Sequence, residues 1–218
     1  MGHPHLKCTI TPVPRPDHAP RKSARLIGSY RGAFEVAIRF PYAGRMVTPP
    51  IDLRENFVSD PHALLRQLRS DVTWDDRMRS RRTASYGAAY NYSQIGYPDV
   101  EMLHALRPIC SMIDRAFGFL PNNCLLNEYP NGDATMGFHS DEIDQLEPGT
   151  GVAILSLGAP RIMVFRLKAD RTTVHRIELN NDSMLYMPAA MQSDWQHAIP
   201  ATPGAAERVS LSFRLLRG

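Results

Sequence analysis

The sequence predicts a protein of the α+β class that is mainly β, a sandwich or jelly roll supported by helices in its N-terminal half. Beyond Pro121, short apolar segments alternate with turn residues at regular spacing, which is typical of these folds. Before Pro121, two segments instead place apolar residues at helical spacing. A length of 218 residues with 43% hydrophobic residues suffices for one domain with a good core.

The N-terminal region differs in composition from the rest of the chain. Residues 1–24 are rich in proline and basic side chains and have little apolar periodicity, so we expect a flexible basic arm. Residues 25–218 are then expected to form a single domain. Within it, residues 34–40 alternate apolar and charged side chains, as a half-buried strand does.

Two helices are predicted ahead of the β-rich half. The first lies within residues 59–70, where Asp60 or the serine before it can cap the helix and Pro61 fits the first turn. The second runs over about residues 100–118, and Pro108 inside it predicts a kink or a break. The strands expected after these helices are residues 124–129, 151–157, 161–167, 173–179, 183–187 and 208–214.

Cysteine usage and hydropathy limit the classes of protein. Cys8, Cys110 and Cys124 are scattered and lack C-x-x-C spacing, so Cys110 and Cys124 are expected to be free buried thiols. No apolar run approaches the roughly 20 residues that span a bilayer, and the start of the chain lacks the apolar core of a secretory signal. We therefore expect a cytoplasmic protein, or a nuclear one in a eukaryote, without a membrane partner. A monomer is expected, although the sequence does not determine the oligomeric state.

The net charge of +3 is modest, but its distribution is uneven. Basic residues gather in residues 15–25 and again in residues 77–82. Such clusters can bind phosphates, although a solvated basic face is the simpler interpretation of either cluster alone.

A metal site is predicted by His139-Ser140-Asp141 together with the later His197. Residues i and i+2 of a strand point to the same face, so His139 and Asp141 can bind one ion from a strand end. His197 would supply the third ligand from a neighbouring strand. Two imidazoles and one carboxylate are the ligands of non-haem Fe(II) oxygenases, which keep the remaining positions open. The H-x-D motif alone is weak, because it often occurs by accident.

The last predicted strand carries a cationic face. Arg208 and Arg214 are six residues apart, so both would face inward with Ser210 and Ser212 between them, while the intervening apolar residues face the other way. Arginine matches a carboxylate bidentately, and buried arginines require anions. A dicarboxylic co-substrate would provide them. The alternative is an edge strand with solvated arginines.

The motifs together resemble those of the AlkB family of iron(II)- and 2-oxoglutarate-dependent dioxygenases, over about residues 51–217. The family pattern is N-x-Y, H-x-D, a distant H and R-x5-R. In this chain the pattern is present, in order, as Asn127-Glu128-Tyr129, His139-Ser140-Asp141, His197 and Arg208 to Arg214. The likeness is closest to the DNA-repair demethylases of that family.

The resemblance implies a double-stranded β-helix (jelly roll), Fe(II), 2-oxoglutarate as co-substrate, and O2. By the same resemblance, Asn127 and Tyr129 hydrogen-bond 2-oxoglutarate, and Arg208 binds its distal carboxylate. Arg214 lies near the carboxylate on the metal side. Ser210 belongs to the same pocket and stands where some relatives carry asparagine.

Substrate contacts are expected mainly from a segment of about residues 74–98, which resembles the nucleotide-recognition lid of these enzymes. Ordinary packing is an equal alternative for each of its aromatic residues. These residues are Trp74, Tyr86, Tyr90 and Tyr92. Arg161 is either a substrate contact or an exposed arginine at a strand end. Ile143 stands where several nucleic-acid demethylases carry an acidic residue.

The expected function is oxidative demethylation of N-alkylated bases in single- or double-stranded nucleic acid, with the base taken out of its stack. An oxygenase of the same chemistry that acts on a protein, a lipid or a small metabolite is the alternative. Ile143 and the modest charge favour that alternative, whereas the tyrosines and the basic clusters oppose it. A non-catalytic β-sandwich binding module with an accidental H-x-D motif is the third hypothesis.

Overall fold

The computed structural model describes residues 47–217, so the predicted arm of residues 1–24 and the predicted strand at 34–40 lie outside the described residues. The two α-helices are α1 (Pro61–Asp71) and α2 (Arg107–Phe117), and short 3-10 helices cover His104–Leu106 and Ala189–Ser193. The strands are β1 (Asp52–Arg54), β2 (Arg82–Gly87), β3 (Tyr90–Tyr92), β4 (Ile95–Tyr97), β5 (Asn123–Tyr129), β6 (Met136–His139), β7 (Gly151–Gly158), β8 (Arg161–Leu167), β9 (Val174–Leu179), β10 (Ser183–Pro188), β11 (Trp195–Ile199) and β12 (Arg208–Arg214).

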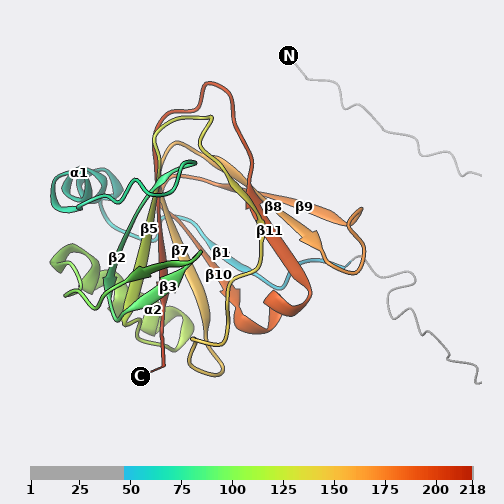
Figure 1. Cartoon of the computed structure of the whole chain (residues 1–218), viewed down its shortest axis with the longest axis horizontal. Helices are drawn as coiled ribbons and strands as arrows, with labels where there is room; N and C mark the ends of the chain where they lie inside the picture. Colours follow the sequence, from blue (N-terminus) through green and yellow to red (C-terminus); the bar gives the residue numbers. More distant parts are fainter. Residues whose placement is uncertain (1–46, 218) are drawn as a thin grey trace, which may run out of the picture. The chain divides into compact units, whose positions relative to one another are not determined.

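Two antiparallel sheets form the body of the described region (Figure 1). The major sheet has six strands in the order β1-β10-β7-β12-β5-β2, and the minor sheet has four in the order β6-β11-β8-β9. From β5 to β12 the chain passes repeatedly from one sheet to the other. This winding is that of a double-stranded β-helix, and it confirms the mainly β jelly roll expected from the sequence. Strands β3 and β4 form a separate hairpin.

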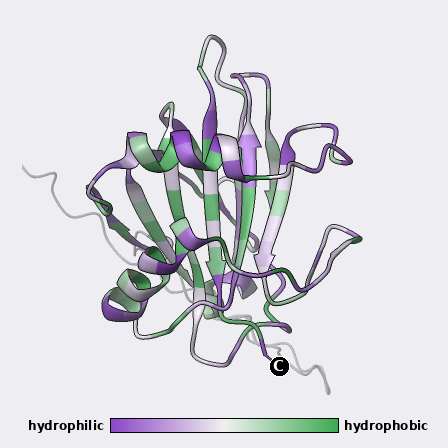
Figure 2. Ribbon diagram, turned by 90° about the vertical axis from the view of Figure 1, so that its left-hand side faces the viewer, coloured by the Kyte–Doolittle hydropathy of each residue, from purple (hydrophilic) through white to green (hydrophobic). Residues whose placement is uncertain are grey.

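The helices cover the outer face of the major sheet (Figure 2). Asp60 caps α1, because its carboxylate accepts a hydrogen bond from Ala63 N at 2.8 Å, as the sequence predicts. Pro108 lies in the first turn of α2, so it begins the helix and neither kinks nor breaks it. The predicted helix at 100–118 is therefore wrong for residues 100–103, and it ends as expected at Gly118, which adopts φ 77°.

Alternation along the strands separates an apolar face from a polar one. On β12, Val209, Leu211 and Phe213 pack into the core beneath the helices. The residues between them, from Arg208 to Arg214, point into the space between the sheets and are also buried. The predicted inward face of this strand is confirmed. The polar interior of the molecule therefore follows directly from the period of two in a β-strand.

The strands predicted after Pro121 are confirmed to within one residue at each end, and those at 161–167 and 208–214 coincide with β8 and β12. Within the predicted lid segment of residues 74–98, residues 82–87 form β2 and pair with β5 in the major sheet. Only the β3–β4 hairpin beyond it stands apart. Cys110 and Cys124 are free and buried, as expected. Neither α1 nor α2 nor any shorter helix within residues 47–217 has the length and apolar character needed to cross a membrane.

Candidate active site

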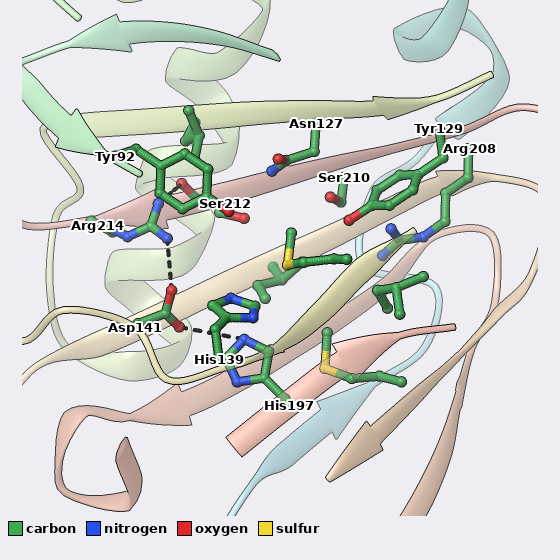
Figure 3. A pocket seen from close by; sticks show the side chains of 15 residues that line it. Tyr92, Asn127, Tyr129, His139, Asp141, His197, Arg208, Ser210, Ser212 and Arg214 are labelled. Atoms are coloured by element: carbon green, nitrogen blue, oxygen red, sulfur yellow. Dashed lines mark hydrogen bonds and ion pairs between the residues drawn. The ribbon is translucent and has the colours of Figure 1, made fainter. Parts of the chain in front are cut away.

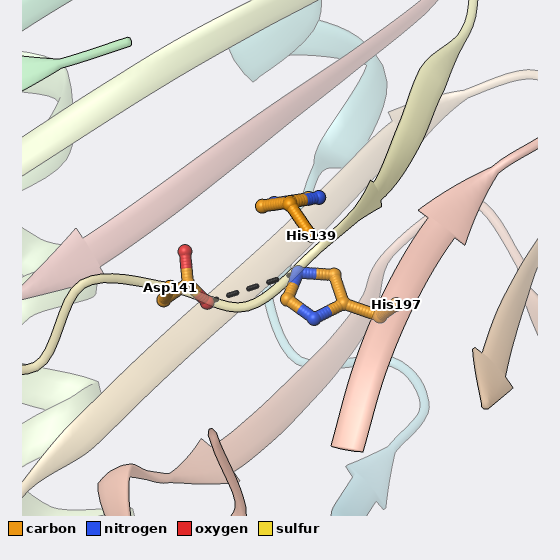
Figure 4. Close-up of side chains that lie close together, drawn as sticks. All are labelled: His139, Asp141 and His197. Atoms are coloured by element: carbon orange, nitrogen blue, oxygen red, sulfur yellow. Dashed lines mark ion pairs between the residues drawn. The ribbon is translucent and has the colours of Figure 1, made fainter. Parts of the chain in front are cut away.

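Pairing of two minor-sheet strands assembles the predicted metal ligands. His197 of β11 is the register partner of His139 of β6, and their rings lie 4.2 Å apart between centroids. Asp141 follows β6 directly. One ligand atom from each of the three side chains lies within 4.8 Å of the other two (Figure 4). The structure therefore brings together the three residues that the sequence predicts as ligands.

The two imidazoles are oriented for metal binding. His139 Nδ1 lies 3.0 Å from the carbonyl oxygen of Gly137, so this nitrogen donates and Nε2 is the ring nitrogen that can face a metal ion. Burial lowers the pKa of His197 to about 4, so its ring is neutral near pH 7. His197 Nε2 lies 3.7 Å from Asp141 Oδ2. A neutral imidazole is the form that binds a metal ion.

Asp141 is held by two side chains, one from β12 and one from the 3-10 helix Ala189–Ser193. Its Oδ1 accepts a hydrogen bond from Arg214 Nη2 at 3.1 Å, and its Oδ2 accepts one from Gln192 Nε2 at 3.3 Å. Gln192 also accepts from the backbone N–H of Asp141 at 3.0 Å. Burial by itself raises the pKa of Asp141, but the nearby His197 and Arg214 outweigh it, so the pKa is lowered and the group is a carboxylate.

These donors fit a bound ferrous ion. Two imidazoles and one carboxylate converge on one face, which is the ligand set of the 2-His-1-carboxylate oxygenases. Gln192 supplies the outer hydrogen bonds that fix the orientation of a ligand carboxylate. No sequence pattern points to Gln192, because it lies in a short 3-10 helix 51 residues from Asp141.

A buried guanidinium lies elsewhere between the sheets (Figure 3). Arg208 is 1% exposed, donates to Ser156 Oγ at 3.0 Å and lies 5.2 Å from the centre of the Tyr129 ring. Its Nε and Nη1 have no hydrogen-bond partner within residues 47–217. Burial lowers the pKa of Arg208, because no carboxylate in the described part of the chain lies nearby to stabilise its positive charge. A buried cation with two unpaired donors fits a carboxylate group.

Polar side chains line the space between Arg208 and the metal ligands. Asn127 and Ser210 are register partners on β5 and β12, and both line the inner cavity. Arg81 donates to Asn127 Oδ1 at 2.8 Å and to the hydroxyl of Tyr92 at 2.6 Å. The side chains leave a cavity of about 20 Å³, enough for a water molecule, and it shares Tyr92 and His139 with a wider neighbouring cavity.

Arg81 is a site residue that sequence reasoning misses. It belongs to the basic run at 77–82, which suggests a solvated surface, yet it is 6% exposed. Two neighbours in that run are neutralised by ion pairs, Arg77 with Asp75 and Arg82 with Glu128. The run therefore contributes less free positive charge than its composition suggests.

A wider cavity of about 370 Å³ adjoins the metal ligands. It is lined by Tyr90 and Tyr92 of the hairpin on one side and by His139, Asp141 and Glu142 on the other. The Tyr90 and Tyr92 rings are stacked 6.2 Å apart. These two tyrosines are the lid residues that the structure brings to the candidate site.

The structure does not bring the other predicted substrate residues to this cavity. Tyr86 is buried in the core beneath the helices and accepts a hydrogen bond from Thr73 N at 3.2 Å, so it lines neither cavity. Trp74 packs against the same core. Ile143 is 39% exposed and lines neither cavity.

One of the two sequence interpretations of Arg161, the exposed arginine at a strand end, is wrong. The residue is only 1% exposed, so it is not an exposed strand-end arginine. Its guanidinium donates to the carbonyl oxygens of Asn131 and Gly132, which lie between β5 and β6. It fixes that loop and does not face the wider cavity.

Comparison with known proteins identifies the class. The sequence profile of the 2OG-Fe(II) oxygenase superfamily matches residues 55–214, a range that contains every residue lining the two cavities. The chain therefore belongs to this superfamily and is an oxidoreductase that uses Fe(II), 2-oxoglutarate and O2. The solved structure of OsALKBH1 shares the fold, with a TM-score of 0.61 and 15% identity over 78% of this chain and 99% of that one.

Within the superfamily, the chain belongs to the AlkB family. It is 31% identical over 205 residues to the alpha-ketoglutarate-dependent dioxygenase alkB homolog 3 of Rattus norvegicus, covering 84% of this chain and 68% of that protein. The Homo sapiens homolog 3 has the same identity, with 84% and 70% covered. The DNA oxidative demethylase ALKBH2 of Mus musculus is 32% identical over 149 residues, with 62% and 61% covered.

Proposed function

We propose that this enzyme removes N-alkyl groups oxidatively from the bases of nucleic acids. The observation that carries the proposal is the cavity of about 370 Å³ between the tyrosine hairpin and the metal ligands, which is of the size of small-molecule sites. Tyr92 and His139 both line this cavity. Names of relatives support the choice of substrate, since ALKBH2 is described as a DNA oxidative demethylase.

The inner residues are assigned to the cofactors. His139, Asp141 and His197 would hold Fe(II), which together with 2-oxoglutarate and O2 supplies the oxidation of a C–H bond. Arg208 would pair with the distal carboxylate of 2-oxoglutarate through its two unpaired donors. Three other polar residues of the inner cavity would contact the co-substrate: Asn127, Tyr129 and Ser210. Arg214 would hold the carboxylate of the ligand Asp141.

The outer residues are assigned to the base. A base taken out of its stack can lie between the rings of Tyr92 and His139, because both line the wider cavity. Arg81 fixes the Tyr92 hydroxyl and so orients that ring. Hydroxylation of an N-methyl group gives a product that loses formaldehyde and leaves the free amine. The protein contributes by orienting the methyl group and excluding water.

Mass spectrometry tests the proposal directly. The protein is loaded anaerobically with Fe(II), then given 2-oxoglutarate, O2 and a single-stranded oligonucleotide that carries one N-methylated base. We expect loss of the methyl group in the wild type and no loss in His139→Ala. His104→Ala is the matched control, because His104 is an exposed histidine of a 3-10 helix remote in sequence from the site.

The two possible failures have different meanings. Succinate formation without demethylation of any methylated DNA or RNA would refute the nucleic-acid substrate and favour a protein, lipid or metabolite. Demethylation that persists in His139→Ala would refute the assignment of the metal ligands.

A further inference from the structure

A third cavity, on the outer face of the minor sheet, is not used by the chemistry described above. It has a volume of about 630 Å³ and lies over strands β6, β11, β8 and β9. We call it the outer groove. The residues that matter for its chemistry are Phe138, Val164, Arg166, Arg171, Arg176 and Pro200. Because side chains alternate along a strand, His139 points between the sheets while Phe138, its neighbour on β6, faces the opposite way.

Phe138 connects the outer groove with the wider cavity of the active site, since it lines both. The residue is 38% exposed although it is a large aromatic. The guanidinium carbon of Arg166 lies 3.8 Å from the centre of its ring, and Arg166 is held in turn by Gln196 Oε1 at 2.9 Å. The ring is therefore a fixed aromatic platform with a cation on one face.

Three arginines gather in the outer groove. Arg166, Arg171 and Arg176 have no carboxylate within 4.0 Å among the residues that the structure describes, whereas Arg69 and Arg107 on the helix side each pair with a glutamate. The two acidic residues that the structure describes near the groove form no ion pair with its arginines. Asp170 accepts hydrogen bonds from Thr172 and Thr173, and Glu178 does not line the groove.

An exposed aromatic ring beside unpaired arginines is the chemistry of single-stranded nucleic-acid binding, in which bases stack on rings and phosphates contact guanidinium groups. We propose that the outer groove binds the nucleotides on one side of the reacting base. The adjacent base stacks on Phe138, and the following phosphates contact Arg171 and Arg176. This inference rests on the proposed function, because the strand enters the groove from the active-site cavity.

Substrate length tests the stacking contact. Two oligonucleotide series place the methylated base at the 5′ or the 3′ end and add one to four unmethylated nucleotides on the other side. We expect kcat/KM to rise with length in only one series. Phe138→Leu should reduce that gain about 5- to 150-fold, whereas Phe138→Trp retains it, because leucine removes the π face and tryptophan keeps it. An equal gain in Phe138→Leu would overturn the proposal.

Salt dependence tests the phosphate contacts without turnover. Anisotropy measures binding of an unmethylated oligothymidylate at several salt concentrations. In the double variant Arg171→Ser, Arg176→Ser, the slope of log K against log salt should fall by about 1.4, or about 0.7 for each phosphate that an arginine no longer neutralises. The matched control, Arg66→Ser with Arg115→Ser, removes two exposed arginines of α1 and α2 and should leave the slope unchanged.

The two proposals fail in different ways. If the wild type demethylates oligonucleotides but neither the length gain nor the salt slope changes in the groove variants, the outer groove is not a nucleic-acid site. If no methylated oligonucleotide reacts while the salt slope falls as expected, the proposed demethylation is wrong and the groove still binds single strands.

Discussion

Replacing Arg208 by methionine should separate the affinity for 2-oxoglutarate from the stability of the fold. Arg208 is 1% exposed, and its Nε and Nη1 have no partner in the described region. If both donate to the distal carboxylate, each charge-assisted hydrogen bond contributes about 1.5–3 kcal/mol. Removal of the pair then weakens binding by about 3–6 kcal/mol, or roughly 10²- to 10⁴-fold in Kd.

The stability of the ligand-free protein should stay the same or rise in Arg208→Met. Methionine removes a buried cation that has no anionic neighbour and keeps most of the side-chain length, so the desolvation penalty disappears. Removal of the hydrogen bond to Ser156 Oγ opposes this by about 1 kcal/mol. We therefore expect the Tm of ligand-free Arg208→Met to equal or exceed that of the wild type.

Thermal unfolding with and without 2-oxoglutarate, with Mn(II) in place of iron to prevent turnover, measures both effects. At 100 times its Kd the ligand stabilises the wild type by about 2.7 kcal/mol, which raises Tm by roughly 5–10 °C. Arg208→Met should lose this rise at the same concentration. A variant that keeps the rise, or that is several degrees less stable without ligand, would refute the assignment.

Arg161→Met is the matched control for this experiment. Arg161 is equally buried, but its guanidinium donates to the carbonyl oxygens of Asn131 and Gly132. Removing it leaves carbonyl groups unsatisfied, which costs about 1–3 kcal/mol of stability. The rise in Tm with 2-oxoglutarate should remain. The two arginines are similarly buried, yet Arg208→Met should abolish the rise in Tm with 2-oxoglutarate at no cost in stability, whereas Arg161→Met should lower stability and keep the rise.

Three further predictions follow from the site and the core. Gln192→Leu frees the Asp141 carboxylate and should weaken metal binding about 10- to 100-fold, as titration calorimetry with Mn(II) would measure; unchanged affinity contradicts it. Arg81→Met releases the Tyr92 hydroxyl and should raise KM for the oligonucleotide about 2- to 10-fold, measured by steady-state kinetics. Burial raises the pKa of Cys110 to about 11, so at pH 8 iodoacetamide should label it only after denaturation, as peptide mass spectrometry would show.

The β-rich half is predictable from the sequence because its strands are long and apolar on at least one face. Strands β8 and β12 are predicted at their observed bounds. The metal-site hypothesis places His139 and His197 on neighbouring strands, but the bounds of β6 and β11, which carry them, are not predicted. Both are short, and on β6 a glycine and a histidine interrupt the apolar pattern, so neither shows a clear period of two.

Arg81 and Gln192, which support the site, are not predicted for a different reason. Arg81 and Gln192 act through hydrogen bonds to residues 46 and 51 positions away in the sequence. A single sequence contains no signal for such long-range pairs. The prediction for Pro108 is wrong because a proline in the first turn of a helix and one inside it differ only in where the helix begins.

The division of the molecule into two sites follows from the minor sheet. Strand β6 presents His139 to the space between the sheets and Phe138 to the outside, so one strand serves both the chemistry and the outer groove. The two sites are therefore coupled by the backbone of β6, and a strand of nucleic acid seated on Phe138 would fix the position of its neighbouring base relative to the metal ligands. A substitution that shifts β6 should then change kcat, whereas Phe138→Leu should act mainly on KM. If Phe138→Leu instead lowers kcat with KM unchanged, the platform positions the metal ligand and not the substrate.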